Sequence, residues 1–241
     1  VERVTWDDAA ARWRVATRDD VYSANVVVVA TGALSEPRLP DLPGRDRFHG
    51  PVFHSARWDS TLSFKNKRVA VLGTGASAVQ FVPAIQPSVS RLTIFQRTPA
   101  WVIPRDDRAY AEGTRALFRR FPMAQRALRA TLNARHEILG VGFRHPQIMK
   151  LLSGIAERHL RRCVPDPELR ARLTPSFVPG CKRILISDDY LPALTRDNVE
   201  LVSGAASSLT PTGVVGADGV ERPADVVILG TGFQVSDFPF A

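Results

Sequence analysis

The sequence predicts an α/β fold in which a β-turn-α-β unit carries a helical insertion. A short apolar strand at 67–73, a helix at 76–85 and a second strand at 91–97 form one βαβ pattern. Apolar residues recur at intervals of three and four between 109 and 173, which is typical of helices. Two apolar strands far apart in the chain end in Ala-Thr-Gly and Gly-Thr-Gly. A strand that leads through glycines into a helix favours a Rossmann-like domain.

The bulk composition indicates a folded globular protein. Of 241 residues, 44% are hydrophobic and 23% are charged. No apolar run approaches the roughly 18 residues that cross a bilayer, and the N-terminus lacks the pattern of a secretion signal. We therefore expect a cytoplasmic protein without a transmembrane segment. Because the chain starts at Val1 inside a strand-like pattern, we also expect an excerpt of a longer protein.

Both ends of the chain predict a meander of strands that runs into an apolar strand. The first meander leads to the run Val26–Ala30, which predicts a buried strand that stops at Thr31 and Gly32. The second leads through a Gly-Ala-Asp-Gly turn to 224–232. This weak repetition suggests that each half closes a nucleotide-binding sheet. The proline-rich segment at 36–44 predicts a linker, since proline disfavours both helices and central strands.

The stretch from about 109 to 173 predicts three or four helices. Between 107 and 172 there are 14 Lys and Arg against 6 Asp and Glu, so this segment holds the whole net charge of +8. Such a basic segment could attract a polyanion, but interleaved apolar residues favour ordinary solvated helices. The apolar positions that set the helical period are Leu117, Phe118, Phe121, Leu128, Leu132, Ile148, Leu151, Leu152 and Ile155.

The cysteine content argues against a metal site or a disulfide framework. Cys163 and Cys181 lie 18 positions apart, a spacing that fits neither a zinc-ligand pair nor a redox CxxC pair. We therefore expect no metal and two reduced thiols.

The turn between the first strand and the helix of the βαβ unit predicts a nucleotide site. Its residues fit the pattern G-x-G-x-x-A between a strand and a helix. The first glycine can form the tight turn, the second lets the backbone approach a diphosphate, and the helix N-terminus supplies free N–H groups. A tight turn without a ligand is the alternative. The proposed contacts are Gly73, Thr74, Gly75, Ala76, Ser77, Ala78 and Gln80.

The end of the second strand distinguishes the two nicotinamide cofactors. An NAD site would place a carboxylate about 20 residues after the glycines. This chain has Arg97 and Thr98 there, and a guanidinium with a hydroxyl suits a 2′-phosphate. We therefore expect NADPH. An exposed surface arginine is the alternative interpretation of Arg97.

The segment ahead of the βαβ unit carries a pattern that resembles a known fingerprint. The chain fits F-x-G-x-x-x-H-x-x-x-W-[PD] and thereby resembles the type I Baeyer-Villiger monooxygenases, which are flavin-containing monooxygenase-like enzymes that use FAD and NADPH. Further motifs of the resemblance follow in order, including FQRTP at 95–99, GCKR at 180–183 and GTGF at 230–233. Gly230 stands where alanine is more usual, a small change. The fingerprint residues are Phe48, Gly50, His54, Trp58 and Asp59.

The resemblance implies the central part of a flavoprotein with two dinucleotide-binding domains. Residues 1–40 would belong to the first half of an FAD domain, and 41–62 would be a linker with the fingerprint. Residues 63–106 and 174–204 would form the NADP-binding domain, with 107–173 as its helical insertion. Residues 205–241 would lead back to the FAD domain. Thr31, Gly32, Thr231 and Gly232 would lie next to FAD.

The resemblance also implies the reaction. NADPH would reduce the flavin, O2 would add at flavin C4a, and the peroxyflavin would insert one oxygen atom into a ketone to give an ester or lactone. Arg183 would be the catalytic arginine, and Lys182 would join Arg97 and Thr98 on the 2′-phosphate. A solvated basic turn is the alternative for the Lys-Arg pair. For His54 and the fingerprint we favour a hinge that orders the linker over proton transfer.

Other functions stay open at this point. An N- or S-oxidising flavin-containing monooxygenase would use the same cofactors. The chain could also be an NADP-binding fragment without catalysis of its own, or its basic helices could bind nucleic acid or a membrane surface, of which we expect neither. A pyridine nucleotide-disulfide reductase would need a redox cysteine pair, which the spacing of Cys163 and Cys181 does not supply. The residues indicate neither the identity of the ketone nor the oligomeric state.

Overall fold

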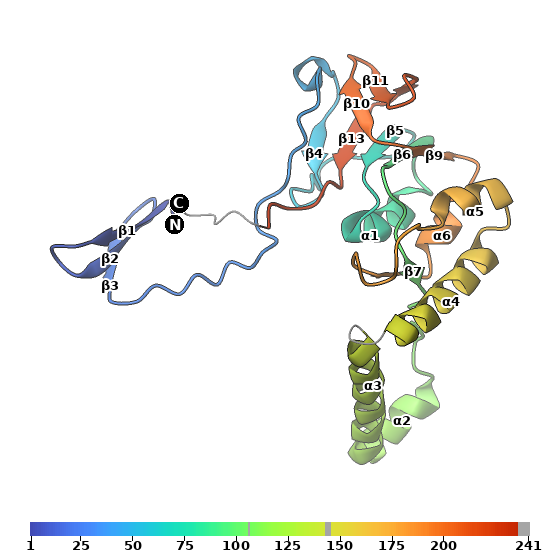
Figure 1. The fold of residues 1–241 in the computed structure, drawn as a ribbon, viewed down its shortest axis with the longest axis horizontal. Coiled ribbons are helices and arrows are strands. Elements are labelled where there is room, and N and C mark those ends of the chain that lie inside the picture. The colour runs from blue at the N-terminus through green and yellow to red at the C-terminus, as the bar shows by residue number, and fades with distance from the viewer. Residues whose placement is uncertain (106, 143–145, 236–241) are drawn as a thin grey trace. The chain divides into compact units, whose positions relative to one another are not determined.

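The chain divides into two compact units. The computed structural model describes the backbone of residues 1–105, 107–142 and 146–235, with the side chains of all but 135, 136, 138, 139, 141, 142 and 146–152. The smaller unit contains Val1–Asp41 and Thr231–Ala241, and the larger contains Leu42–Gly230 (Figure 1).

The smaller unit is built on an antiparallel meander. Strands β1 (Arg3–Asp7), β2 (Arg12–Ala16) and β3 (Val21–Ala24) pair in the order β1-β2-β3. Trp6 and Trp13 face each other across β1 and β2, with ring centroids 5.3 Å apart at 68°. Edge-to-face packing of this kind stabilises a cross-strand pair. The meander predicted from the sequence is thus confirmed.

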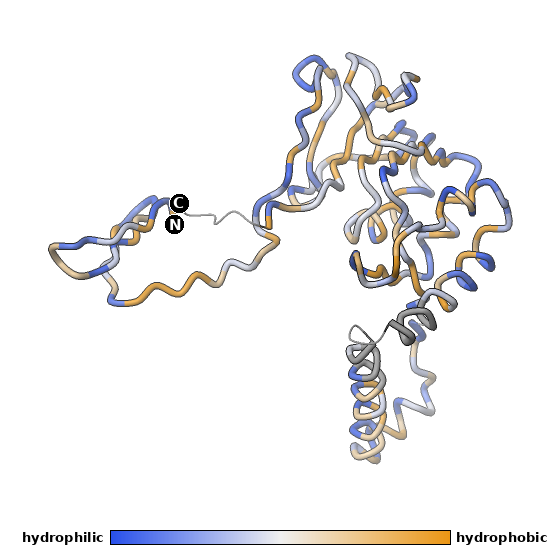
Figure 2. The backbone as a smooth tube through the Cα atoms, in the orientation of Figure 1, coloured by the Kyte–Doolittle hydropathy of each residue, from blue (hydrophilic) through white to orange (hydrophobic). Residues whose placement is uncertain are grey.

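The predicted buried strand at Val26–Ala30 is wrong. These residues have no strand assignment, and Val26 and Val28 are 74% and 82% exposed. The run is the long orange stretch after β3 (Figure 2). An apolar run becomes a buried strand only when neighbouring strands pair with it and another layer covers it. Among the described residues no strand pairs with 26–30, and the third strand of the meander is β3.

The larger unit is organised around a five-stranded parallel sheet with the order β4-β13-β5-β6-β9. Its central strands read as continuous apolar runs, which parallel strands need because both faces are covered. The predicted βαβ unit is confirmed, as β5, α1 and β6. The strands are β4 (Val52–His54), β5 (Arg68–Leu72), β6 (Arg91–Gln96), β9 (Val199–Ser203) and β13 (Val226–Leu229).

The expected division of the chain assigns two of these strands to segments outside the NADP-binding domain. It places 41–62 in a linker and 205–241 on the way to a second domain, whereas β4 and β13 are paired strands of this sheet. β13 lies between β4 and β5, and the larger unit extends to Gly230. Sequence order does not fix strand order, because a strand distant along the chain can insert beside the first strand of a βαβ unit.

Different layers cover the two faces of the sheet. Val69 and Val71 of β5 point to one core with helix α1 (Ala76–Ile85) and helix α6 (Tyr190–Ala193). Ala70 and Leu72 point to a second core with an antiparallel sheet. This alternation follows the two-residue period of a strand. The antiparallel sheet consists of β10 (Ala206–Leu209), β11 (Gly213–Gly216) and β12 (Glu221–Pro223).

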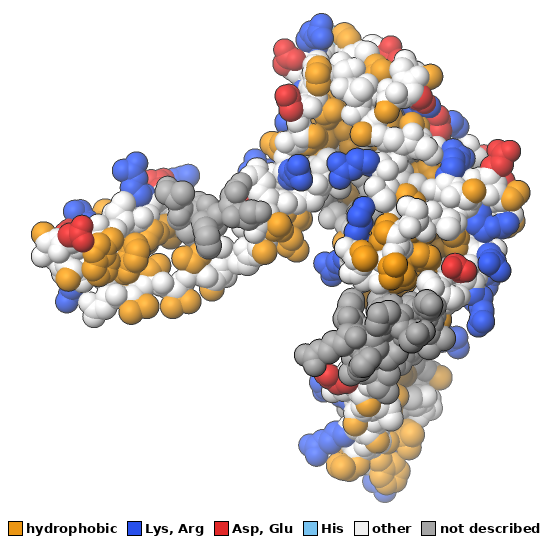
Figure 3. Space-filling view, in the orientation of Figure 1, with side chains coloured by type: hydrophobic (Ala, Val, Ile, Leu, Met, Phe, Trp, Pro, Cys, Tyr) orange, Lys and Arg blue, Asp and Glu red, His pale blue; other side chains and the backbone are white. Residues whose placement is uncertain are grey.

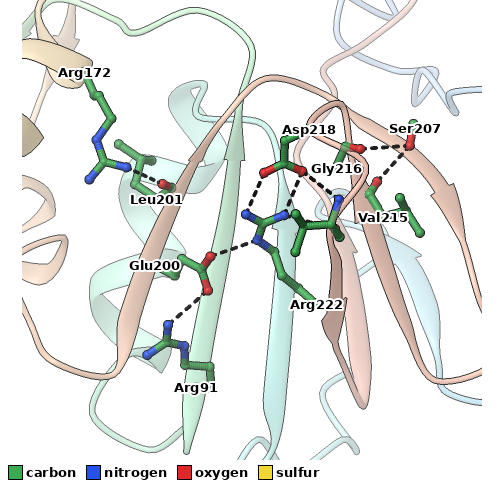
Figure 4. Close-up of polar contacts among 10 residues, drawn as sticks. Arg91, Arg172, Glu200, Leu201, Ser207, Val215, Gly216, Asp218 and Arg222 are labelled. Carbon is green, nitrogen blue, oxygen red and sulfur yellow. Dashed lines mark hydrogen bonds and ion pairs between the residues drawn. The ribbon is translucent and has the colours of Figure 1, made fainter.

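An ionic network joins the antiparallel sheet to the parallel sheet (Figure 4). Glu200 of β9 accepts hydrogen bonds from Arg222 at 2.8 Å and Arg91 at 3.0 Å, and Arg222 also donates to Asp218 at 2.8 Å. Partial burial would raise the pKa of Glu200, but these arginines outweigh it and hold that pKa below its usual value. The hydrogen bonds from Arg222 also lower the pKa of Asp218.

The described residues between 107 and 173 form four helices, which confirms the helical period predicted for this segment. They are α2 (Glu112–Arg120), α3 (Pro122–Gly142), α4 (Pro146–Cys163) and α5 (Pro167–Leu173). Ala156 and Leu160 of α4 are buried, whereas Leu117 and Phe121 are exposed. The predicted apolar positions Ile148, Leu151 and Leu152 lie outside the described side chains.

The surface of the insertion is basic. Blue side chains line the edge over α4 and α5 in Figure 3. Across the described parts of the chain, no helix combines the length and the apolar character that a membrane crossing requires.

The remaining short elements anchor loops. A 3₁₀ turn, η1 (Arg45–Arg47), precedes the fingerprint. Strands β7 (Val102–Ile103) and β8 (Leu185–Ile186) pair in parallel and connect the segment after β6 to the segment before α6.

Candidate nucleotide site

The turn after β5 has a backbone that only glycine fits well. Gly73 has φ +108°, a value that residues with a side chain rarely adopt. Its N–H donates to the Phe95 carbonyl at 3.0 Å. A Cβ on Gly73 would also collide with the backbone of Gly230, coming within 3.0 Å of its carbonyl carbon. The first glycine of the motif therefore makes the tight turn and lets the β5 and β13 ends approach closely.

The next residues present an open helix N-terminus. Gly75 is the N-cap of α1 and gives no side-chain cap, so the first N–H groups of the helix are available to a ligand. A Cβ at Gly75 would meet nothing within 4 Å, so packing inside this chain does not require glycine there. Ala76 and Ser77 are half-buried beside it. This geometry suits a diphosphate that lies against the turn.

Two further residues of the glycine motif, Ala78 and Gln80, make contacts within the chain. Ala78 is fully buried in the core between α1 and the sheet. Gln80 is exposed, and its Nε2 donates to the Ala76 carbonyl at 3.0 Å. Ala78 thus permits close packing of α1, while Gln80 bonds to its own helix.

The turn lies at a switch point of the parallel sheet. From β5 the chain moves through α1 to β6 on one side, whereas β13 occupies the other side of β5 (Figure 1). All five strands are parallel, so their carboxyl ends meet at one edge. Ligands of open α/β sheets bind outside the carboxyl ends at such a point.

Arg97 and Thr98 follow directly after β6, next to the glycine turn. The Thr74 hydroxyl donates to the Thr98 carbonyl at 3.4 Å, which joins the turn to the end of the neighbouring strand. Thr74 is buried, and Arg97 is exposed. The structure therefore brings Thr98 to the turn and leaves the guanidinium of Arg97 accessible.

Lys182 and Arg183 lie on an exposed loop between α5 and β8. The Lys182 Nζ lies 4.9 Å from the centroid of the Phe177 ring. The Trp101 Nε1 donates to the Phe177 carbonyl at 2.8 Å. Since Trp101 is four positions after Arg97, the loop is anchored to the segment that carries Arg97 and Thr98.

The first half of the fingerprint fixes β4 at the edge of the sheet. Phe48 is buried in the core shared with the antiparallel sheet. A Cβ on Gly50 would reach the Asp225 backbone, with 3.0 Å to its carbonyl carbon, so this position also favours glycine. His54 is 2% exposed, and its Nδ1 accepts from the Ala56 N–H at 3.1 Å. Nδ1 therefore carries no proton, and the ring holds the turn after β4.

The second half of the fingerprint contacts helix α1. Trp58 is 39% exposed, yet its ring lies 5.5 Å from Phe53, 5.5 Å from Phe64 and 5.4 Å from Phe81 of α1. Asp59 closes a turn by accepting from the Thr61 N–H at 2.9 Å and the Thr61 hydroxyl at 2.6 Å. These hydrogen bonds lower the pKa of Asp59. We name the four rings Phe53, Trp58, Phe64 and Phe81 the aromatic cluster.

The residues expected next to FAD lie in the smaller unit. Gly32 and Gly232 have φ +74° and +83°, and a Cβ on either would meet nothing within 4 Å. The Thr231 hydroxyl donates to the Arg38 carbonyl. Thr31 stands just before the turn at Gly32, in a segment without strand assignment.

Two features of the site are absent from the sequence prediction. The Gly73–Gly230 contact involves positions 157 apart, and only the second Gly-Thr-Gly signalled that a glycine stands there. The anchoring role of Trp101 had no signal beyond the presence of a tryptophan soon after Arg97.

Comparisons with known proteins agree on one family. The family model described as "Flavin-binding monooxygenase-like" matches residues 3–137. A protein of Streptomyces coelicolor named "Baeyer-Villiger monooxygenase" is 48% identical over 242 residues, which cover 100% of this chain and 47% of that protein.

Solved structures give the same result and confirm the α/β fold class. Cyclohexanone monooxygenase from Rhodococcus sp. Phi1 bound to NADP⁺ matches with a TM-score of 0.78 and 28% identity, over 97% of this chain and 51% of that one. OTEMO in complex with FAD and NADP matches with a TM-score of 0.80 and 27% identity, over 97% and 52%. The chain spans about half the length of the relatives that it matches.

Proposed function

The chain belongs to the flavin-binding monooxygenase-like family. We propose that the protein acts as an FAD- and NADPH-dependent Baeyer-Villiger monooxygenase. The whole protein would insert one oxygen atom of O2 into a ketone and form an ester or lactone. The observation that carries this proposal is the glycine turn after β5, with its open helix N-terminus at the switch point of the sheet. The 48% identity to a Baeyer-Villiger monooxygenase supports the choice of reaction.

The described residues fit NADPH at this turn. The open space at Gly75 leaves room for a diphosphate, and the α1 N-terminus supplies N–H donors with a partial positive charge. Arg97, Thr98 and Lys182 would hold the 2′-phosphate, because guanidinium and ammonium groups form charged hydrogen bonds with phosphate oxygens. NADPH supplies a hydride when it is bound.

FAD is proposed for the whole protein, and Thr31, Gly32, Thr231 and Gly232 would lie beside it. Bound FAD supplies the redox chemistry with O2. This chain's own contribution is to hold the nicotinamide nucleotide and to place Arg183. Arg183 is exposed, and the planar donors of its guanidinium can stabilise negative charge that develops during oxygen transfer.

We further propose that the fingerprint is a structural brace and not a proton-transfer site. His54 is buried and bonds to the turn after its own strand, and Trp58 packs against α1 through the aromatic cluster. The Trp58 contact connects the β4 segment to the nucleotide-binding layer, whereas the His54 bond holds the turn within that segment. Through the Trp58 contact, a movement of the fingerprint segment would also move the sheet and helix α1.

A product assay on the whole protein tests the reaction class. The enzyme is given NADPH, O2 and a ketone, or in parallel an amine or a thioether. We expect an ester or lactone from the ketone at the higher rate. Oxidation of the amine or thioether with an intact ketone would instead support the N- or S-oxidising alternative. Arg183→Ala should abolish ester formation, and an unchanged rate in that variant would refute the role of Arg183.

A flavin measurement addresses the remaining alternative. If the chain acts only as an NADP-binding fragment, the purified chain should bind NADPH and should retain no flavin absorbance after incubation with FAD and removal of the unbound FAD. The cytoplasmic location stays a prediction.

A further inference from the structure

We propose that Trp101 and Phe177 are positioning residues that place Lys182 for the 2′-phosphate of NADPH. This inference rests on the proposed function and adds two specificity-determining side chains outside the sequence motifs. Neither would touch the reacting atoms. They would act through the loop at 177–185, here named the lysine loop.

Trp101 holds the lysine loop at both ends. Its indole Nε1 donates to the Phe177 carbonyl at 2.8 Å, and its own carbonyl accepts from the Leu185 N–H at 2.8 Å. Trp101 is buried and its indole bond to Phe177 is partly buried, so water screens this bond less than it would screen an exposed one. One residue thereby fixes where the loop begins and where it ends.

The β7–β8 pair extends this anchor away from the loop. Val102 pairs with Leu185, Ile103 pairs with Ile186, and the Ser187 N–H donates to the Ile103 carbonyl at 3.0 Å. These contacts begin at Trp101, four positions after Arg97. The place of Lys182 relative to Arg97 is therefore set by backbone hydrogen bonds on one side of the loop and by the Trp101 indole on the other.

Phe177 orients the ammonium group itself. The Lys182 Nζ lies over the Phe177 ring, 4.9 Å from its centroid, within the distance at which a ring attracts a cation. A lysine side chain is flexible, and an exposed one loses rotamer entropy when it binds a phosphate. The ring reduces that loss by holding the ammonium group before the nucleotide arrives. Attraction of this kind at an exposed site corresponds to about two- to fivefold in affinity.

Adenosine 2′,5′-bisphosphate and AMP separate the phosphate contact from the rest of the nucleotide. Binding of both to the purified chain is measured by calorimetry for the parent, Phe177→Leu, Phe177→Tyr and Trp101→Phe. Phe177→Leu should lower the affinity for the bisphosphate about two- to fivefold and leave the affinity for AMP unchanged. Phe177→Tyr retains a ring face and should bind like the parent. Trp101→Phe should lower the affinity for the bisphosphate more than Phe177→Leu does, again without an effect on the affinity for AMP.

The possible results separate this inference from the proposed function. If the parent prefers the bisphosphate and Phe177→Leu retains the full preference, the positioning role is refuted and the nucleotide site stands. If Phe177→Leu lost affinity for both nucleotides equally, the ring would have only a structural role, and the inference would also be overturned. A parent chain that binds neither nucleotide would overturn the proposed function and this inference with it.

Discussion

Replacing Gly73 by alanine should destabilise the larger unit and abolish nucleotide binding, whereas the same change at Gly230 should do neither. Alanine at 73 would have to adopt φ +108°, and strain of this kind costs ~1–3 kcal/mol. Its Cβ would also displace the Gly230 backbone. We therefore expect the free energy of unfolding to fall by about 2–4 kcal/mol in Gly73→Ala.

Gly230→Ala is the matched control, because it changes the other partner of the same contact. A Cβ at Gly230 would lie 3.4 Å from the Leu72 carbonyl oxygen and 3.8 Å from the Ala78 Cβ, which are ordinary contacts. Its unfolding free energy should stay within ~0.5 kcal/mol of the parent. Urea denaturation followed by circular dichroism measures both variants. Equal midpoints for Gly73→Ala and the parent would refute the role assigned to the turn.

Gly75→Ala separates ligand approach from folding. A Cβ at this position meets nothing within 4 Å, so the unfolding free energy should fall by at most ~1 kcal/mol, the scale of an N-cap change. The added methyl would stand where the diphosphate approaches, and NADPH affinity should fall at least about tenfold, which is ~1.4 kcal/mol. A variant that folds and binds like the parent would show that the diphosphate lies elsewhere.

The remaining predictions concern the ionic network, the aromatic cluster and Arg183. Glu200→Gln should lower the unfolding free energy by about 1 kcal/mol at pH 7, because it weakens the hydrogen bonds to Arg222 and Arg91, and unfolding at the parent midpoint would contradict the network. Since the folded pKa of Glu200 is lowered, its contribution to the free energy of unfolding should be full at neutral pH and should decrease as the pH falls below the ordinary glutamate pKa; a parent–variant difference that does not decrease on acidification would argue against this. Trp58→Ala should lower the free energy of unfolding by about 2 kcal/mol. Trp58→Phe should lower it clearly less, because a ring still contacts the other three rings of the cluster. Arg183→Ala should leave the midpoint of urea unfolding unchanged, and a large shift would indicate a structural role.

Local patterns predicted the βαβ unit and the helical insertion well. The continuous apolar runs of β5 and β6, and the glycine motif between β5 and α1, depend on residues close in sequence. The same holds for Gly73, whose unusual φ follows from the tight turn that the motif predicts. Secondary structure that is set by nearby residues is what a sequence pattern can show.

Features that depend on distant partners could not be predicted in this way. Val26–Ala30 has the composition of a buried strand, but composition cannot show whether a neighbouring strand is there to pair with it. The insertion of β13 beside β5 is equally non-local, and so is the approach of Gly230 to Gly73. The hydrogen bond from Trp101 to Phe177 spans 76 positions, and no local signal marks either residue as an anchor.

The most direct test of the central claim is a titration of the purified chain with NADPH and with NADH, for the parent and for Arg97→Ala. The account predicts that the parent binds NADPH at least about tenfold more tightly than NADH, and that Arg97→Ala removes most of this preference while NADH binding stays the same. Equal affinity of the parent for the two nucleotides, or no binding of either, would contradict it.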